Sequence, residues 1–169
     1  MSPPAGPLLR RARFEDWPGI ARLLRDIDEL HAGLAPQYFR SAPRAEVDWQ
    51  RVLADPTAAV FVAAGGSGAE GSSGSATGLL GLLSIRVYDT PADPTMVPRR
   101  RGHIETLVVE TCHRRRGIGR RLLEQAADWA RAQGAVELVL TTWTGNQAAD
   151  AFYERLGYRV LSRVLHAPL

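Results

Sequence analysis

Apolar positions along the chain follow two periods, one typical of helices and one typical of strands. Ile20, Leu23 and Ile27 are three or four residues apart, which predicts a helix with one buried face from about residue 15 to residue 34. Pro36 ends this helix, because proline cannot continue the backbone hydrogen bonds. Shorter, nearly continuous apolar runs predict strands, at residues 8–14, 58–64, 79–87 and 102–110.

Helical and strand-like patterns alternate in the second half of the chain. Helices are predicted at residues 117–133 and 146–155, and strands at residues 135–142 and 158–164. Gly134 and Gly157 follow the two helices, where a left-handed cap belongs. With a further short helix at residues 44–54, the expected order is β-α-α-β-β-β-α-β-α-β. This order predicts an α/β fold: a mixed sheet with a strand–helix–strand crossover in its second half.

A glycine- and serine-rich segment separates two of the predicted strands. Nine of the eleven residues at positions 65–75 are glycine or serine, a composition that forms flexible connections and cannot pack into a core. A linker between two domains is one interpretation. The first 64 residues are too few and too open to fold alone, so we expect an expanded hairpin loop within a single domain spanning residues 1–169.

Composition narrows the class of protein. A chain of 169 residues that is 45% apolar suits one globular domain with a sizeable core. No apolar run approaches the roughly 18 residues of a membrane span, and residues 1–7 lack the apolar core of an export signal, so we expect a cytoplasmic protein without membrane contact. The single cysteine, Cys112, excludes an internal disulfide, and the four histidines show no ligand spacing. No metal site is therefore expected.

The most informative segment is a basic turn between a predicted strand and a predicted helix. Its two glycines allow a tight turn that brings backbone N–H groups close to an anion, and the following helix adds unpaired donors. The planar guanidinium group of arginine can donate two parallel hydrogen bonds to the oxygens of one phosphate. Taken alone, a basic helix start is more often a solvated charged turn, and the arginines carry less weight because all 21 basic residues of the chain are arginine. Its members are Arg114, Arg115, Arg116, Gly117, Ile118, Gly119 and Arg120.

Two separated segments together resemble the GNAT superfamily of N-acetyltransferases. Residues 103–109, running into Arg114-x-x-Gly117-x-Gly119, resemble its acetyl-CoA-binding motif. About thirty residues later, the pattern Asn-x-x-Ala-x-x-x-Tyr-Glu-x-Leu-Gly-Tyr at residues 146–158 resembles its second signature. The predicted order of elements also resembles the family fold over nearly the whole chain, apart from the Gly/Ser segment. The resemblance implies that the central sheet is splayed.

The resemblance implies how acetyl-CoA would be held. Backbone groups of Leu107 and Val109, within the strand segment that also contains Val108, would pair with pantetheine, and the pyrophosphate would bind residues 114–120. Asn146 would approach pantetheine. Simpler interpretations remain open: residues 107–109 could only pack the core, and Asn146 could only cap a helix.

Two residues are candidates for proton transfer. Glu105 lies in an otherwise apolar strand, where an unpaired carboxylate is costly, so it is expected to face a cleft. The resemblance implies that it is the base for the amine; a solvent-facing strand position is the alternative. Tyr153 matches the family tyrosine that protonates the leaving thiolate, with core packing as its alternative.

The expected function is transfer of an acetyl group from acetyl-CoA to a primary amine of a small molecule or peptide. Residues 26–40 and 89–101 would meet this acceptor, and homodimers are common in the family. A non-catalytic CoA-binding sensor is the alternative, although it would need neither Glu105 nor Tyr153. Nucleic-acid binding is not expected, because no aromatic residues are interleaved with the basic patch.

Overall fold

The computed structural model describes residues 6–65 and 78–167, and its centre is one five-stranded sheet. The spatial order follows the chain order, with β1 to β4 antiparallel and β5 parallel to β4. The α/β prediction is confirmed. The strands are β1 (Leu8–Arg11), β2 (Ala58–Ala64), β3 (Leu79–Asp89), β4 (Arg100–Val109) and β5 (Glu137–Val139).

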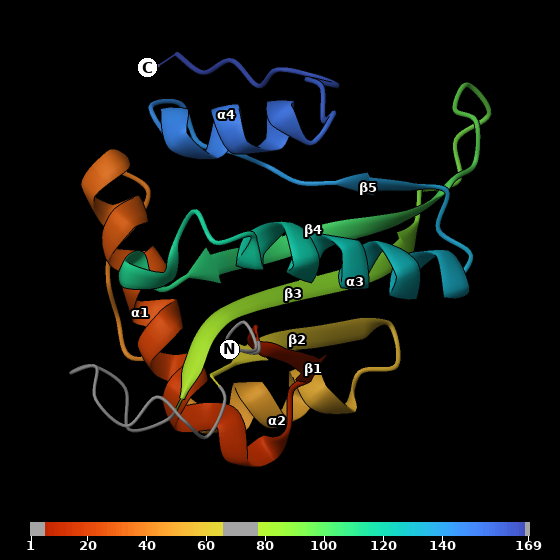
Figure 1. Ribbon diagram of the computed structural model, residues 1–169. Coiled ribbons are helices and arrows are strands. Elements are labelled where there is room, and N and C mark those ends of the chain that lie inside the picture. The colour runs from red at the N-terminus through yellow and green to blue at the C-terminus, as the bar shows by residue number, and fades with distance from the viewer. Residues whose placement is uncertain (1–5, 66–77, 168–169) are drawn as a thin grey trace.

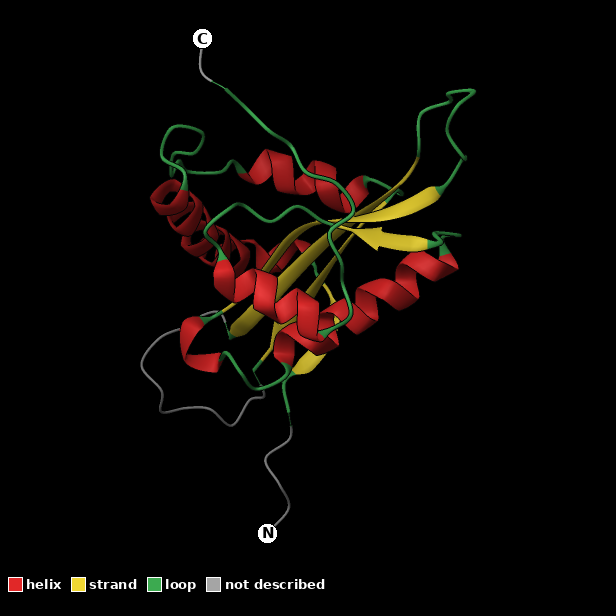
Figure 2. Ribbon diagram, turned by 90° about the horizontal axis from the view of Figure 1, so that it is seen from above, coloured by secondary structure: helices red, strands yellow, loops and turns green. Residues whose placement is uncertain are grey.

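Helices cover both faces of the sheet (Figure 1 and Figure 2). Helix α3 packs on one face, against β2, β3 and β4, while α1 and α2 pack on the other. The predicted helices all form, with ends within two residues of those expected. They are α1 (Trp17–Leu34), α2 (Glu46–Ala54), α3 (Ile118–Ala132) and α4 (Gln147–Arg155). Within residues 6–65 and 78–167, no helix has the length and apolar character to cross a bilayer.

Each face of the sheet has its own apolar core. On the α3 side, Leu83 and Ile85 of β3 meet Leu122 of α3, all of them inaccessible to solvent. On the other side, Ile20 and Leu23 of α1 pack on β2 and β3. Burying side chains of this size contributes about 1.5–3 kcal/mol each relative to exposure. The alternating side chains of the central strands therefore hold the helices in fixed positions around β4.

Strands β2 and β3 form a hairpin on either side of the Gly/Ser segment. Gly65 donates its backbone N–H to the carbonyl of Gly78 at 2.6 Å, which closes the ladder where the two strands end. The flanks of the segment are thus neighbouring strands of one sheet. Residues 66–77, most of the predicted flexible insertion, lie outside the described residues.

The sheet splays between β4 and β5. The parallel pairing covers only Arg101–His103 of β4 and Glu137–Val139 of β5, although β4 continues to Val109. From Ile104 onward, the edge of β4 that faces away from β3 has no strand beside it among the described residues. The predicted splay thus creates an open strand edge in the centre of the molecule.

Two expectations about the second half were wrong. The predicted strand at residues 135–142 is only three residues long, Glu137–Val139. The strand predicted at residues 158–164 does not form: this segment is extended but pairs with no strand in the described chain. Its apolar residues remain exposed, Val160 at 75% and Val164 at 96%. Their alternation resembled a strand, but β5 ends too early to give it a partner.

Candidate active site

The open edge of β4 presents unpaired backbone groups. Glu110 donates its backbone N–H to the carbonyl of Leu80 on β3 at 2.9 Å. Because alternate residues of an antiparallel strand face the same neighbour, Val108 also pairs with β3, whereas Leu107 and Val109 point their polar groups away from it. The backbone groups of Leu107 and Val109 therefore face the open edge of β4, and their binding to a ligand stays a prediction.

Val108 has a different position from its two neighbours. Its side chain is 6% exposed and packs into the core on the α1 and α2 side, and its backbone belongs to the β3 ladder. Leu107 and Val109 contribute side chains to the core on the α3 side and are only partly buried. Val108 thus supports the open edge, while Leu107 and Val109 line it.

The basic turn forms a concave set of backbone donors. Arg115 has φ +60° and Gly117 has φ +77°, both in the left-handed region, which turns successive N–H groups toward one side. Within the part of the chain that the structure describes, the N–H groups of Arg115, Arg116 and Gly117 have no hydrogen-bond acceptor. Helix α3 begins directly afterwards with Ile118, whose side chain is buried, and adds its own unpaired first-turn donors. The turn suits an anion.

The arginines of this turn differ in what they already bind. Arg114 donates from Nε to the carbonyl of Val109 at 3.0 Å, which ties the turn back to the end of β4. Arg120 pairs with Glu124, one helical turn later, at 2.8 Å. Arg115 and Arg116 are exposed and have no ion pair with any described residue. Arg115 and Arg116 thus offer their full charges to a phosphate.

Helix α4 lies close to the start of α3 because Gly119 has no side chain. A Cβ atom at Gly119 would lie 3.2 Å from the ring of Phe152. Asn146 is the N-cap of α4, and its amide oxygen accepts the backbone N–H of Ala149 at 3.2 Å. The Asn146 amide nitrogen makes no hydrogen bond to another described residue. Asn146 therefore caps the helix and still has a donor for a ligand.

A β-bulge in β4 determines where Glu105 points. Ser84 pairs with Thr106 and Ile85 with Ile104, so Glu105 is the extra residue without a partner in β3. The bulge reverses the alternation of side chains along β4. Ile104, before the bulge, and Leu107, after the bulge, both face the core on the α3 side, although they are three residues apart. Glu105 therefore lies on the α1 and α2 side of the sheet, and its side chain is 35% exposed.

An ion-pair network holds Glu105. Arg86 of β3 donates from Nε to Oε1 of Glu105 at 3.1 Å and from Nη1 to Asp55, at the end of α2. Hydrogen bonds from Thr57, joined by the Arg86 guanidinium, lower the pKa of Asp55 to about 2. The second oxygen of Glu105, Oε2, has no partner among the described residues. Arg86 was missed at the sequence level, although opposite charges in two neighbouring apolar strands could have indicated the pair.

Tyr153 lies on the α3 side of the sheet, opposite to the face that carries Glu105. Its ring packs at the border of the α3 core, 5.2 Å from the Phe152 ring and 5.4 Å from the Tyr158 ring, centre to centre. Burial, with a smaller contribution from Tyr158, raises the pKa of Tyr153 to about 12. Its hydroxyl has no hydrogen-bond partner within the described residues and keeps its proton at neutral pH. Glu105 and Tyr153 thus lie on opposite faces of the sheet.

An aromatic cluster joins two loops near the site. Phe39, in the connection between α1 and α2, packs edge-on against Trp143, in the connection between β5 and α4, with ring centres 4.7 Å apart. Tyr38 lies 5.3 Å from the same indole and is 51% exposed. Residues 26–40 were predicted to meet an acceptor, but Trp143 was not, because only the folded chain brings it next to them.

Several charges expected near an acceptor are already paired. Asp28 accepts two hydrogen bonds from Arg44, at 2.5 and 2.9 Å. Asp89 pairs with Arg100 at 3.0 Å, and Arg101 pairs with Glu137 at 2.7 Å. These pairs fix the loops and leave less charge for attracting a ligand.

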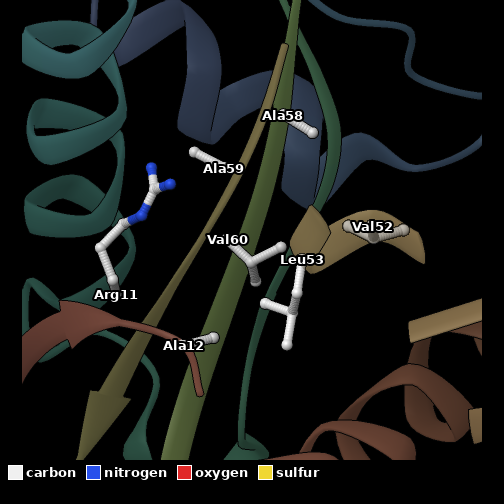
Figure 3. Close-up of a pocket in the computed structure, with 7 residues that line it drawn as sticks. All are labelled: Arg11, Ala12, Val52, Leu53, Ala58, Ala59 and Val60. Atoms are coloured by element: carbon white, nitrogen blue, oxygen red, sulfur yellow. The ribbon is translucent and has the colours of Figure 1, made fainter. Parts of the chain in front are cut away.

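A separate hollow lies between β2 and α2 (Figure 3). Arg11 extends away from α2, and its guanidinium lies over the rings of Phe61 and Trp129 at 5.5 and 5.7 Å. The hollow otherwise has an aliphatic lining and does not include the β4 edge or the basic turn. Its lining residues are Arg11, Ala12, Val52, Leu53, Ala58, Ala59 and Val60.

The acetyltransferase (GNAT) family matches residues 21–158, a stretch that includes β4, the basic turn, α3 and α4. The chain belongs to the GNAT acetyltransferase family. It is similar to N-alpha-acetyltransferase 30 of Schizosaccharomyces pombe, with 41% identity over 58 residues, which are 34% of this chain and 39% of that protein. Matches to curated relatives such as this one span less than half of their length.

Solved structures share the GNAT fold over nearly the whole chain. A mutant of the BH1408 protein from Bacillus halodurans has a TM-score of 0.83 at 26% identity, covering 96% of this chain and 99% of that one. An aminoglycoside N-acetyltransferase in complex with CoA has a TM-score of 0.66 at 16% identity, covering 96% of this chain and 98% of that one. At this identity, the second likeness concerns the fold alone.

Proposed function

We propose that this GNAT acyltransferase moves an acetyl group from acetyl-CoA directly to a primary amine of a small molecule or peptide. One observation carries the proposal: the open edge of β4 at Leu107 and Val109, where only the Val109 carbonyl is already bound, by Arg114, continues into the unpaired N–H groups of residues 115–117. An extended amide chain that ends in a pyrophosphate matches this sequence of groups. The neighbouring fold with bound CoA supports the same choice of donor.

The described residues fit such a ligand from end to end. The pantetheine arm would pair with Leu107 and Val109 and receive a hydrogen bond from the free amide of Asn146. The pyrophosphate would rest on the N–H groups of the basic turn, with Arg115 and Arg116 balancing its charge. When bound, acetyl-CoA supplies the activated acyl group, and the chain supplies position and proton transfer.

Glu105 and Tyr153 then divide the proton transfers between them. Glu105 uses the free Oε2 to take a proton from the amine, directly or through a water molecule, while Arg86 holds Oε1. Tyr153 donates its hydroxyl proton to the leaving thiolate from the opposite face. Because burial raises the pKa of Tyr153 to about 12, this proton is present throughout the neutral range. Because the two residues lie on opposite faces of the sheet, they would act from opposite sides of the same acyl carbon.

The acceptor enters on the α1 and α2 side, where Glu105 is accessible. The exposed ring of Tyr38 and the partly exposed Tyr88 of β3 border this side, so the amine would approach past aromatic surfaces. Related proteins differ in acceptor: one is named for N-alpha-acetylation and another for aminoglycosides. The acceptor class must therefore be found by experiment.

The decisive experiment incubates the purified protein with acetyl-CoA and separate pools of polyamines, amino acids, aminoglycosides and short peptides. Free CoA is quantified by chromatography, since a thiol dye would also label the exposed Cys112. We expect CoA release that depends on one pool and is about 10²-fold slower in Glu105→Gln. Acetyl-CoA binding by calorimetry with no release in any pool would contradict transfer and favour the sensor alternative.

A further inference from the structure

The turn that precedes the phosphate loop brings together three side chains with metal-binding chemistry. Nδ1 of His113 lies 2.9 Å from Oε2 of Glu110 and 3.0 Å from Sγ of Cys112. One ligand atom from each residue lies within 4.8 Å of the other two. Carboxylate oxygen, thiolate sulfur and imidazole nitrogen are the three protein donors that zinc binds.

The backbone holds this group in place. Glu110 is attached to β3 through its N–H bond to Leu80, and His113 donates its N–H back to the Glu110 carbonyl at 2.9 Å, within a 3-10 turn. Arg22 of α1 donates to Oε1 of Glu110 at 2.8 Å, which leaves Oε2 for His113. Outer hydrogen bonds of this kind orient the ligands of protein metal sites.

We propose that Glu110 Oε2, Cys112 Sγ and His113 Nδ1 bind one Zn²⁺ ion, with a water molecule as the fourth ligand. A thiolate and an imidazole favour zinc over magnesium or calcium, which prefer oxygen donors. Binding replaces the S–H bond of Cys112 with an S–Zn bond and releases the thiol proton to solvent. Zinc ligands lie about 3.5 Å apart in a tetrahedron, so the donors must separate by a few tenths of an ångström.

Exposure and charge both permit this arrangement. Cys112 is exposed, so its thiol can rotate and the ion can enter from solvent, whereas the side chains of Glu110 and His113 are only 13% and 20% exposed. The carboxylate and the thiolate carry two negative charges, which exceed the single positive charge of Arg22. The site does not depend on the proposed acetyl transfer, but it ends one residue before Arg114, so zinc would fix the start of the phosphate loop.

The test is a zinc titration of the full chain against a chromophoric chelator, at several protein concentrations. We expect one ion per chain, one proton released from the thiol, and affinity lowered more than about tenfold in both Cys112→Ser and His113→Ala. Cobalt, used as a spectroscopic substitute, should show a sulfur-to-metal absorption band that Cys112→Ser lacks. His166→Ala is the matched control, because it removes an exposed histidine far along the chain.

Equal zinc affinity in the parent protein and Cys112→Ser would overturn the proposal, as would a loss of binding in His166→Ala alone. A stoichiometry of one ion per two chains would also overturn it, since it would indicate a site between copies. Thermal unfolding of each variant without metal separates lost ligation from misfolding. A third single-ligand variant, Glu110→Gln, should reduce the affinity without removing the cobalt–sulfur band.

Discussion

Arg86 and Glu105 face each other across two neighbouring strands, with 3.1 Å between Nε of the guanidinium and Oε1 of the carboxylate. Only Oε1 is engaged among the described residues, and the bulge at Glu105 points the carboxylate out of the apolar ladder. The same arginine binds Asp55, so carboxylates from β4 and from the end of α2 converge on the guanidinium of Arg86. The arrangement fixes the direction of Oε2, which a base requires.

Replacing Glu105 with glutamine should lower kcat by about 10²-fold, because the shape is kept but the proton acceptor is lost. The affinity for acetyl-CoA should change little, since Glu105 does not belong to the phosphate turn or to the open backbone edge. Steady-state CoA release and calorimetry measure the two quantities.

Asp128→Asn, on the exposed surface of α3, is the control that should leave kcat and acetyl-CoA affinity unchanged. Two variants of Arg86 then separate removal of the base from loss of its orientation. Arg86→Lys should lower kcat about tenfold and Arg86→Gln further, because lysine keeps the charge but cannot bridge Asp55 and Glu105 in the same way. Equal activity in Glu105→Gln and the parent protein would remove Glu105 from the mechanism.

Replacing Tyr153 with phenylalanine should also reduce kcat by about 10²-fold, while acetyl-CoA binds almost as tightly as before. The ring remains to pack against Phe152 and Tyr158, so the loss isolates the hydroxyl proton. Tyr158→Phe is the matched control, because its ring belongs to the same stack. A parallel loss of acetyl-CoA affinity in Tyr153→Phe would indicate a binding role instead of an acid role.

The raised pKa of Tyr153 predicts a stability change at high pH. An unfolded tyrosine loses its proton near pH 10, whereas folded Tyr153 keeps it up to a pKa of about 12. Its contribution to folding is therefore fully present below pH 10 and is lost as the pH rises through 12. We expect the free energy of unfolding of the parent protein to fall relative to that of Tyr153→Phe above pH 10. Urea unfolding at pH 8 to 11.5 checks this, and a constant difference would contradict it.

The elements that the sequence predicted are those set by local patterns. The helical spacing of Ile20, Leu23 and Ile27 matches the buried face of α1, and the apolar run at residues 58–64 is β2. Residues 158–164 show the limit of such patterns, because a strand also needs a free neighbouring edge. The bulge at Glu105 contains no glycine or proline that would indicate it in the sequence. Simple alternation along the strand therefore assigns the side chains of residues 106–109 to the wrong faces of the sheet.

Long-range contacts explain the rest of what the sequence did not predict. Trp143 meets Tyr38 and Phe39 only after β5 and the α1–α2 connection have packed. The group at Glu110, Cys112 and His113 is different, because its members are close in sequence. The single cysteine and the spacing of the histidines gave no indication of this group, because one of its three members is a carboxylate. The available signal was a carboxylate, a thiol and an imidazole within four residues of the end of a predicted strand.

The left-handed conformation of Gly117 can be tested by alanine substitution. At φ +77°, a side chain costs about 1–2 kcal/mol, so the turn should relax and its N–H groups should lose their common direction. We expect acetyl-CoA affinity to weaken about tenfold in calorimetry, which corresponds to about 1.4 kcal/mol. Gly157→Ala is the matched control: its φ is +88° and a Cβ has no neighbour within 4 Å, so it should lose stability without losing affinity.

Gly102 sets how closely β4, β5 and α3 approach one another. A Cβ at this position would lie 2.7 Å from Leu138 and 3.1 Å from the Cβ of Ala130, with Ile85 also in contact. Gly102→Ala should therefore cost about 1–3 kcal/mol of stability, because the last paired residues before the splay must move apart. Gly33→Ala, in α1 with open space around the new Cβ, should instead stabilise the helix by up to about 1 kcal/mol. Urea unfolding of the two variants measures both changes. If Gly102→Ala were as stable as Gly33→Ala, β4 and β5 could separate without cost, and the splay would not depend on this contact.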